Sequence, residues 1–594
     1  MKVVRKLFSI LSNAEKKELG LLVLLVVGMA FLDVIGIASI MPFMTILINQ
    51  SLVTENPFVN EIYLNAQKIG IDNVSEFLIT LGFAVLFIFV FSIIYRAITL
   101  YLQTRFVLTK ECSIAGRLLE SNLQQPYGWF LKKHSSDLGK NILSEVEMVV
   151  HGVLAPFISL VTYSLVSLAV LSLLIYVDPF LAMVVGGVLS SAFVIVFWST
   201  RSYLAKIGKQ RVVANNDRFR AINNVFGAIK EVKFGGFENT YLAKFIGPAF
   251  TYANLNVNAQ FIGQLPKYFL EMFAFGGILL LVIYNMAIAG GGGDAIALVA
   301  LYAVAGYRLM PALQQIYLAT TRIRFALPAL DVLYSNLGSH HYIHEECRDA
   351  VVFEREISFK EISFIYPGSK NKSLDEFSIS ILKGEKVGLA GPSGSGKTTT
   401  IDILLGLLQA NSGGLYVDGS IVNLEKAQAW KKLIGYVPQE IYLSDDTLAA
   451  NIAFGVEKDA IDMEAVFKAA KVANINSFVE SLPLKYETPL GERGVRFSGG
   501  QRQRIGIARA LYHDPQILIL DEATSALDTI SEKAIIDAMG NLGKDKTIIL
   551  IAHRLELLKN CDRIILIKDG KLHGSGSYEE LVRSNPLFKE MAST

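Results

Sequence analysis

Six long apolar blocks lie in the first 320 residues, and they constrain the fold more than any other feature of the chain. A helix needs about 20 apolar residues to cross a membrane, and each block exceeds that length. The first block is too long for a signal-peptide core and lacks a small-residue cleavage site, so it counts as a span. We therefore expect an all-α, six-helix membrane domain over residues 1–334. The blocks cover residues 19–48, 77–104, 152–177, 180–203, 262–289 and 295–320.

The charges of the connecting loops predict how these spans are oriented. The connection between spans two and three carries six Lys or Arg residues, and the one from residue 201 to 244 carries nine. The loops on the other side hold only Lys68. Because Lys and Arg concentrate on the cytoplasmic side, both termini and both long connections should be cytoplasmic, in a multi-pass protein of the inner (plasma) membrane. The N-terminal segment adds Lys2, Arg5, Lys6, Lys16 and Lys17.

The two long cytoplasmic connections are polar but rich in helix-forming residues with apolar periodicity. This pattern favours helices that continue beyond the membrane, and solvated loops are the alternative. On the opposite side, residues 57–70 could form a short helix on the outer membrane surface or a packed loop. The helical alternative would align Phe58, Ile62, Ala66 and Ile69 on one face.

After about residue 330 the composition becomes that of a soluble protein, which places a linker at 335–356 and a second domain at 357–594. The linker holds a group of side chains that invites a metal site, but no second ligand cluster stands nearby, so a solvated linker is favoured. A formal net charge of +2 argues against nucleic acid as a partner. The linker group consists of His340, His341, His344, Glu345, Glu346 and Cys347.

The octet GPSGSGKT at 391–398 fits the phosphate-loop pattern GxxxxGK[ST]. The preceding KVGLAG is typical of a strand and the following TTIDILLGLL of a helix, which is the context that this motif requires. Backbone amides of the loop would wrap the phosphates, Lys397 would reach the β- and γ-phosphates, and the Thr398 hydroxyl would bind Mg²⁺. The predicted nucleotide-binding residues here are Gly391, Pro392, Ser393, Gly394, Ser395, Gly396, Lys397, Thr398 and Thr399.

The segment ILILDE predicts a second buried strand that ends in two carboxylates. Asp521 would support Mg²⁺, and Glu522 is placed to polarise the attacking water as the catalytic base. The alternative for Glu522 is a surface carboxylate, which four preceding apolar strand residues make the weaker interpretation.

The sequence FSGGQRQRIGIARAL, from Phe497, resembles the signature of ATP-binding-cassette (ABC) proteins. The other family motifs accompany it in order: YVPQE, LGERG, SALD at 525–528 and IAHR. The resemblance implies an α/β P-loop ATPase domain that uses ATP and Mg²⁺, with Thr398, Gln439 and Asp521 at the metal. It further implies that Tyr366 stacks on adenine, that His553 contacts the γ-phosphate, and that a second cassette supplies its signature to each ATP. The signature residues are Ser498, Gly499, Gly500 and Gln501.

Spans and cassette on one chain, spans first, resemble half of an ABC exporter. Importers usually separate the two, and ABC ATPases that transport nothing lack the spans. One cassette per chain implies a pair, and because no motif is degenerate a homodimer is expected, with a heterodimer as the alternative. In exporters the turns of the cytoplasmic connections dock on the cassettes, which suggests the turns near Tyr127 and Phe226.

The membrane half is similar, more narrowly, to PglK-type flippases of lipid-linked oligosaccharides, through ASIMPFMTI, YRAI, LPKYFLE and YRLMP. In LPKYFLE, Lys267 occupies the position where that family has arginine. The positive charge is kept, but a lysine cannot make the two parallel hydrogen bonds of a guanidinium. The resemblance implies an ATP-driven flippase that moves a polyprenyl-diphosphate-linked oligosaccharide outward. The alternatives are an exporter of phospholipid, lipid A or hydrophobic drugs, and an ATP-gated channel or regulator.

Three cations lie deep within the predicted spans, away from their ends, and a charge at the centre of a span costs roughly 2.5–3.5 kcal/mol. Counted at 1.5 Å per residue from the outer surface, Arg308 lies ~20 Å deep, Arg96 ~29 Å and Lys267 ~33 Å. We interpret the three as the site that receives a lipid diphosphate from the inner leaflet. The alternatives are pairing with Asp33 and Glu271, and snorkelling of Arg96 and Lys267 to the inner interface.

Overall fold

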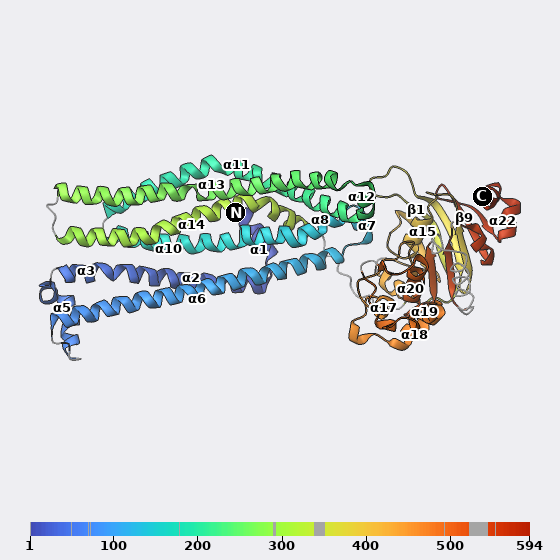
Figure 1. The fold of residues 1–594 in the computed structure, drawn as a ribbon, viewed down its shortest axis with the longest axis horizontal. Helices are drawn as coiled ribbons and strands as arrows, with labels where there is room; N and C mark the ends of the chain where they lie inside the picture. The colour runs from blue at the N-terminus through green and yellow to red at the C-terminus, as the bar shows by residue number, and fades with distance from the viewer. Residues whose placement is uncertain are drawn as a thin grey trace. The chain divides into compact units, whose positions relative to one another are not determined.

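The computed structural model describes residues 2–48, 50–68, 71, 73–177, 179–288, 293–337, 351–423, 425–491, 494–521, 545–552 and 554–593. For some helical residues, among them 58, 293–305 and 308, it describes the backbone alone. The chain divides into two compact units, shown in Figure 1. The first comprises Met1–Gln125 and Lys133–His341, and the second comprises Pro126–Lys132 and Tyr342–Thr594.

The described part of the first unit is helical throughout. Its short helices are α1 (Lys2–Ile10), α3 (Ile40–Ile48), α4 (Leu52–Glu55), α5 (Pro57–Gln67) and α12 (Ile229–Gly235). Its long helices are α2 (Asn13–Ala38), α6 (Val74–Leu123), α11 (Pro179–Gly227), α13 (Glu238–Ile288) and α14 (Gly293–Leu337). A further helical run consists of α8 (Ser135–Lys140), the π-helical η1 (Asn141–Glu145), α9 (Val146–Val149), the π-helical η2 (Val150–Leu154) and α10 (Ala155–Val177).

Each of the six predicted spans lies on these helices. Over the described residues, three stretches are long and apolar enough to cross a membrane: Asn13–Leu47, Val74–Leu123 and Ser135–Val177. The other predicted spans, 180–203, 262–289 and 295–320, lie on α11, α13 and α14, apart from residue 289, which is outside the described residues.

The helical extensions predicted for the two long connections are confirmed. At 1.5 Å per residue, the 50 residues of α6 give a rod ~75 Å long, and the 49 residues of α11 one of similar length. The hydrocarbon core of a membrane is about 30 Å thick, so more than half of each rod lies beyond it. The long helices run side by side in Figure 1.

Helix α14 is in contact with α10, α11 and α13, and it forms the centre of this unit. A glycine allows the closest of these approaches: a Cβ at position 208 of α11 would overlap the carbonyl oxygen of Phe325 on α14. Ala326, Ala329, Leu330 and Leu333 on the same helix are fully buried. Small residues let helix backbones approach closely, which is how helices pack where lipid provides no hydrophobic drive.

A buried ion pair links η1 to α11 outside the predicted spans. Arg211 donates from Nη2 to Glu145 Oε2, and Asn215 Nδ2 donates to Glu145 Oε1 at 3.0 Å. Both charged side chains are at most 1% exposed. Within the described part of the chain, Nε and Nη1 of Arg211 have no hydrogen-bond partner, although the guanidinium carbon lies 6.0 Å from the ring centroid of Tyr252. Such a pair is costly to bury and far costlier to break.

Residues 57–67 form α5, so the helical alternative for this segment is confirmed. Ile62 is exposed, whereas Tyr63 is buried and meets the ring of Phe77 edge-on at 5.2 Å. Val59 and Ala66 also pack into this small cluster. The inward face is set by Phe77 on α6 rather than by the contrast between apolar and polar residues along α5. Residue 69 and the side chain of Phe58 lie outside what is described.

The second unit is an α/β domain with two sheets. The antiparallel sheet has the order β2-β1-β4-β5, and the other has the order β10-β9-β3-β8-β7-β6, parallel except for β10. The strands are β1 (Glu356–Phe364), β2 (Leu374–Leu382), β3 (Lys386–Ala390), β4 (Ser412–Val417), β5 (Ser420–Ile421), β6 (Ile434–Val437), β7 (Ile517–Asp521), β8 (Thr547–Ile551), β9 (Arg563–Lys568) and β10 (Lys571–Gly576).

Helices accompany these sheets. They are α7 (Tyr127–Phe130), α15 (Lys397–Leu404), α16 (Ala427–Lys431), α17 (Leu448–Ile452), α18 (Met463–Val472), α19 (Asn476–Glu480), α20 (Gly499–Leu511), α22 (Tyr578–Ser584) and α23 (Pro586–Ser593), with short 3₁₀ turns η3 (Lys458–Ala460), η4 (Lys485–Glu487) and η6 (Leu555–Asn560).

Strands β7 and β8 are buried on both faces, which explains their continuous apolar sequence. Successive residues enter opposite cores, since side chains alternate along a strand. Leu518 and Leu520 pack with the helical side around α17, α18 and α20, while Ile517 and Ile519 pack with the antiparallel sheet. The parallel sheet therefore separates two cores and is held rigidly between them.

Candidate functional site

The predicted phosphate loop lies between β3 and α15, as the motif requires. Gly391, Gly394 and Gly396 all have positive φ, and a Cβ at Gly391 would overlap the carbonyl oxygen of Ile567. Only glycine fits that position, so the loop curls without side chains on its inner side. The hydroxyl of Ser395 is buried and has no hydrogen-bond partner among the residues that the structure describes. The loop thus presents unfilled hydrogen-bonding capacity at a helix N-terminus, which suits phosphate oxygens.

Lys397 begins α15 and folds back over this loop. Its Nζ donates to the carbonyl oxygens of Gly391, at 2.8 Å, and Pro392, at 3.0 Å. These bonds hold the ammonium at the loop, where a phosphate oxygen could replace a carbonyl as its acceptor. Pro392 is half-buried, and Ser393 and Thr398 are exposed.

The ends of parallel strands bring the other predicted ligands to the same edge. Because β6, β7, β8 and β3 run parallel, their carboxyl ends lie together. Asp521 ends β7, Gln439 follows β6 by two residues, and Thr398 lies at the start of the helix after β3. The hydroxyl of Tyr436 donates to Asp521 Oδ2 at 3.3 Å. This arrangement supplies oxygen donors of the kind that Mg²⁺ prefers.

Asp402 is a carboxylate at this site that the sequence did not predict. It lies on α15, and burial together with the charge of Asp521 raises its pKa to about 6. No motif contains it, because an aspartate one turn inside an amphipathic helix has the pattern of a solvent-facing residue. Its environment is created by Asp521, which is distant in sequence. Strongly shifted carboxylates cluster at functional sites, so we count it among the candidates.

Tyr366 lies where an aromatic ring could stack on a base. Its hydroxyl is 3.2 Å from Thr399 Oγ1 on α15, and its ring meets Phe364 edge-on at 5.0 Å. The side chain is half-buried, and burial raises its pKa. The hydroxyl contact fixes the ring beside the helix that follows the phosphate loop. The adenine-stacking role of Tyr366 stays a prediction.

The segment Pro126–Lys132 belongs to the same unit as this site. A Cβ on Gly128 would lie 3.8 Å from Leu408 Cδ2, in ordinary contact. The pKa of Tyr127 is raised, first by burial and then by the charge of Asp402. The turn near Tyr127 was predicted to dock on the cassette, and its contacts agree with that prediction. Phe226, named with it, belongs to the first unit and is 66% exposed.

The signature residues start α20. Ser498 is the N-cap: its Oγ accepts from Gln501 N at 3.2 Å, and Gln501 Oε1 accepts from Ser498 N at 2.8 Å. Gly499 and Gly500 form the first turn of the helix. Ser498 is exposed, so the amides of this N-terminus face solvent at a point where an anion could bind.

Arg509 anchors α20 to the preceding loop. It donates to the carbonyl oxygens of Asn451 and Tyr442, both at 2.8 Å, and its guanidinium carbon lies 4.5 Å from the ring centroid of Phe454. Burial lowers its pKa to about 10. These contacts fix the helix that carries the signature.

Several predicted residues lie outside the described residues. They include both proposed catalytic residues, Glu522 and His553, as well as Glu492, the SALD motif at 525–528 and the histidines of the linker. The side chain of Arg308 is also among those not described, although its backbone lies on α14.

The other two predicted substrate cations have carboxylate partners. Arg96 Nη2 lies 2.5 Å from Oδ2 of the buried Asp33, whose Oδ1 also accepts from Ser92. Lys267 Nζ lies 3.8 Å from Glu271 Oε1, one turn along α13. The pairing that we considered as an alternative is therefore present for both. Each of the two acids partly neutralises one cation.

Known proteins resemble the chain over most of its length. A family profile described as ABC transporter matches residues 374–525. An "ATP-dependent lipid A-core flippase" of Ralstonia nicotianae is 30% identical over 482 residues, which cover 80% of each chain. "ABC transporter B family member 29, chloroplastic" of Arabidopsis thaliana is 32% identical over 76% of this chain and 70% of its own. A solved bacterial Atm1-family ABC exporter with ATP bound has a TM-score of 0.78, with 22% identity, and covers 96% of this chain and 98% of its own.

Proposed function

Because this chain belongs to the ABC transporter family, as an ATP hydrolase coupled to transport across a membrane, we propose that it moves a phosphorylated glycolipid from the inner to the outer leaflet. Its fold is that of an Atm1-family exporter: a helical membrane domain followed by an α/β ATPase domain. The observation that carries the hydrolytic half of the proposal is the glycine-lined loop of 391–396, with Lys397 held against it.

We assign ATP to this loop and to Tyr366. The loop amides and Lys397 bind the phosphates, and the ring of Tyr366 stacks on adenine. Thr398, Gln439 and Asp521 are the residues that would hold Mg²⁺, which supplies charge neutralisation on the β- and γ-phosphate oxygens. Glu522, immediately after Asp521, polarises the water, and His553 contacts the γ-phosphate.

A homodimer follows from the single cassette per chain. The exposed N-terminus of α20 offers the amides behind Ser498 to the nucleotide of a second copy. Each ATP would then lie between the loop of one copy and the signature of the other. The proposed membrane orientation, with both termini cytoplasmic, follows from the loop charges.

The proposed substrate is a glycolipid with a phosphorylated head group. The first candidate is a polyprenyl-diphosphate-linked oligosaccharide, which rests on the short membrane motifs and on the intramembrane cations. The second is lipid A-core, which is favoured because relatives that match 80% of the chain carry that name. Both lipids present phosphate groups to the membrane interface, so the same cations could receive either.

Arg308 is the residue on which the substrate proposal depends most. Asp33 pairs with Arg96 and Glu271 pairs with Lys267. These are the two acids of the predicted spans, and Arg308 is the third of the deep cations. One positive charge per chain is thus left over, which a phosphate would neutralise. We propose that Arg308, with Arg96 and Lys267, receives the head group.

The test is a flipping assay in proteoliposomes with each glycolipid separately. Arg308→Ala should abolish flipping of the true substrate and leave basal ATP hydrolysis largely intact. Lys68→Ala, which removes a cation from the loop between the first two spans, is the control and should flip at the normal rate. If the Arg308→Ala variant flips lipid at the wild-type rate, the proposed cation site is rejected. If the wild-type protein flips neither lipid, the proposal of a glycolipid substrate is rejected.

A further inference from the structure

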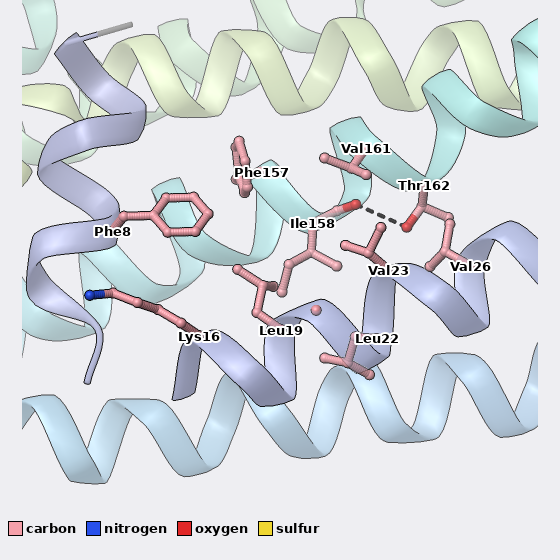
Figure 2. A pocket seen from close by; sticks show the side chains of 11 residues that line it. Phe8, Lys16, Leu19, Leu22, Val23, Val26, Phe157, Ile158, Val161 and Thr162 are labelled. Carbon is pink, nitrogen blue, oxygen red and sulfur yellow. Dashed lines mark hydrogen bonds between the residues drawn. The ribbon is translucent and has the colours of Figure 1, made fainter. Parts of the chain in front are cut away.

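A cavity of about 200 Å³ lies in the first unit between α1, α2 and α10. Its lining is almost entirely apolar, from Phe8 on α1, Leu19 and Val26 on α2, and Phe157 and Ile158 on α10. The hydroxyl of Thr162, at one end, already donates to Ile158 O at 2.9 Å (Figure 2). The groove therefore suits a hydrocarbon chain rather than a polar molecule.

The length of the groove matches one leaflet. Its lining on α2 extends from Lys16 to Val26, which is ~15 Å at 1.5 Å per residue. Half of the ~30 Å hydrocarbon core is the same length. Since α2 enters the membrane at this end, the groove would run along the acyl chains of the cytoplasmic leaflet, given the orientation proposed above.

One cation stands at the head-group end. Lys16 lies toward the end where Phe8 lines the groove, whereas Val26 and Thr162 line the other end (Figure 2). Among the described residues the ammonium of Lys16 has no acidic partner and donates to Asn13 Oδ1 at 3.4 Å. The neighbouring carboxylates are engaged elsewhere: Glu15 with Arg117, at 3.1 Å.

The acids near this end are already paired. Glu18 is paired with Lys110 at 2.7 Å, so it does not offset the charge of Lys16. Lys6 pairs with Asp331 on α14 at 2.6 Å, which fixes α1 over the groove. A chain-shaped apolar groove that ends at a cation complements a lipid with a negative head group.

We propose that this groove binds one acyl chain of an anionic glycerophospholipid of the cytoplasmic leaflet, with its head-group phosphate at Lys16. A lysine near an anionic membrane surface contributes about a fivefold change in affinity. The site is distinct from the proposed glycolipid path, and it rests on the proposed function only for the membrane orientation.

The test measures binding of phosphatidylglycerol and of diacylglycerol, which has no phosphate, to the purified full-length protein in detergent, without ATP or glycolipid. Lys16→Gln should weaken phosphatidylglycerol binding about fivefold and leave diacylglycerol binding unchanged. Lys17→Gln, which removes the adjacent charge outside the lining, should leave both unchanged. An equal loss in the two variants would indicate diffuse surface attraction and overturn the site.

Filling the groove tests the acyl chain separately. Gly20 lines the groove, and a Cβ there would meet nothing within 4 Å, so Gly20→Leu should fold and reduce binding of both lipids. Gly116→Leu, on the exposed side of α6 where a Cβ is equally free, is the matched control. Thermal unfolding in lipid-free detergent checks that both variants fold.

Unchanged binding of phosphatidylglycerol to Gly20→Leu would reject the groove as its site. If that variant instead loses glycolipid flipping while phosphatidylglycerol still binds, the occupant is the transported lipid and the proposal is wrong. Binding is measured without ATP and without glycolipid. The result therefore stands even if the proposed glycolipid substrate proves to be wrong.

Discussion

Glu145→Gln should destabilise the first unit more than any exposed ion-pair substitution. The change removes the negative charge that the buried Arg211 contacts, while Nε and Nη1 of that arginine already lack partners among the described residues. Breaking a buried pair in this way costs about 3–5 kcal/mol, because the remaining charge is left in a low-dielectric interior.

This energy can be converted into a temperature. In domains of 150–250 residues, 1 kcal/mol shifts the midpoint of unfolding by about 2–4 °C. We therefore expect the midpoint to fall by roughly 6–20 °C in a thermal unfolding experiment on the detergent-solubilised protein. Asp137→Asn is the matched control, since its partner Arg220 is 42% exposed and such a pair is worth at most about 1 kcal/mol.

A double variant separates charge burial from packing. Replacing both Glu145 and Arg211 by Met removes the uncompensated charge and should recover most of the lost stability. If Glu145→Gln unfolds within a degree or two of Asp137→Asn, the carboxylate does not compensate a buried charge and the reasoning is refuted.

Three further outcomes are expected. Glu522→Gln should retain ATP binding but lose most hydrolysis, whereas Lys397→Ala should weaken binding itself; near-normal turnover by the first variant would contradict its role. Tyr127→Ala or Phe226→Ala should uncouple ATP hydrolysis from transport, measured in the same proteoliposomes, and a parallel loss of both activities with protein yield would argue for packing alone. Asp402→Asn should raise the unfolding temperature at pH 8, because the folded-state pKa of this acid is raised to about 6 and its charge destabilises the fold above that pH. The advantage should shrink as the pH falls from 6 towards 4, and an advantage independent of pH would exclude an electrostatic cause.

Local patterns were sufficient to predict most of the helices and the phosphate loop. The six spans and their extensions depend on runs of apolar residues and helix formers, and the loop of 391–396 on glycines that must adopt positive φ. The capping box of Ser498 and Gln501 is likewise contained within four consecutive residues. Such features need no knowledge of the tertiary fold.

Features that depend on distant contacts were missed. The inward face of α5 is decided by Phe77, which packs against Tyr63. Asp402 acquires its raised pKa only when β7 brings Asp521 beside it. The ion pair of Glu145 joins α11 to a π-helical segment that the sequence periodicity did not predict. In each case one partner is set by the fold, not by neighbours in sequence.

The unbroken length of α6 makes it a mechanical lever. Only Gln124 and Gln125 separate its end at Leu123 from the segment Pro126–Lys132, which belongs to the ATPase unit. A rod ~75 Å long converts a tilt of about 5° at one end into a displacement of about 6–7 Å at the other. A small rotation of the ATPase unit would thus be amplified, at the far end of this span, to more than the pitch of a helical turn.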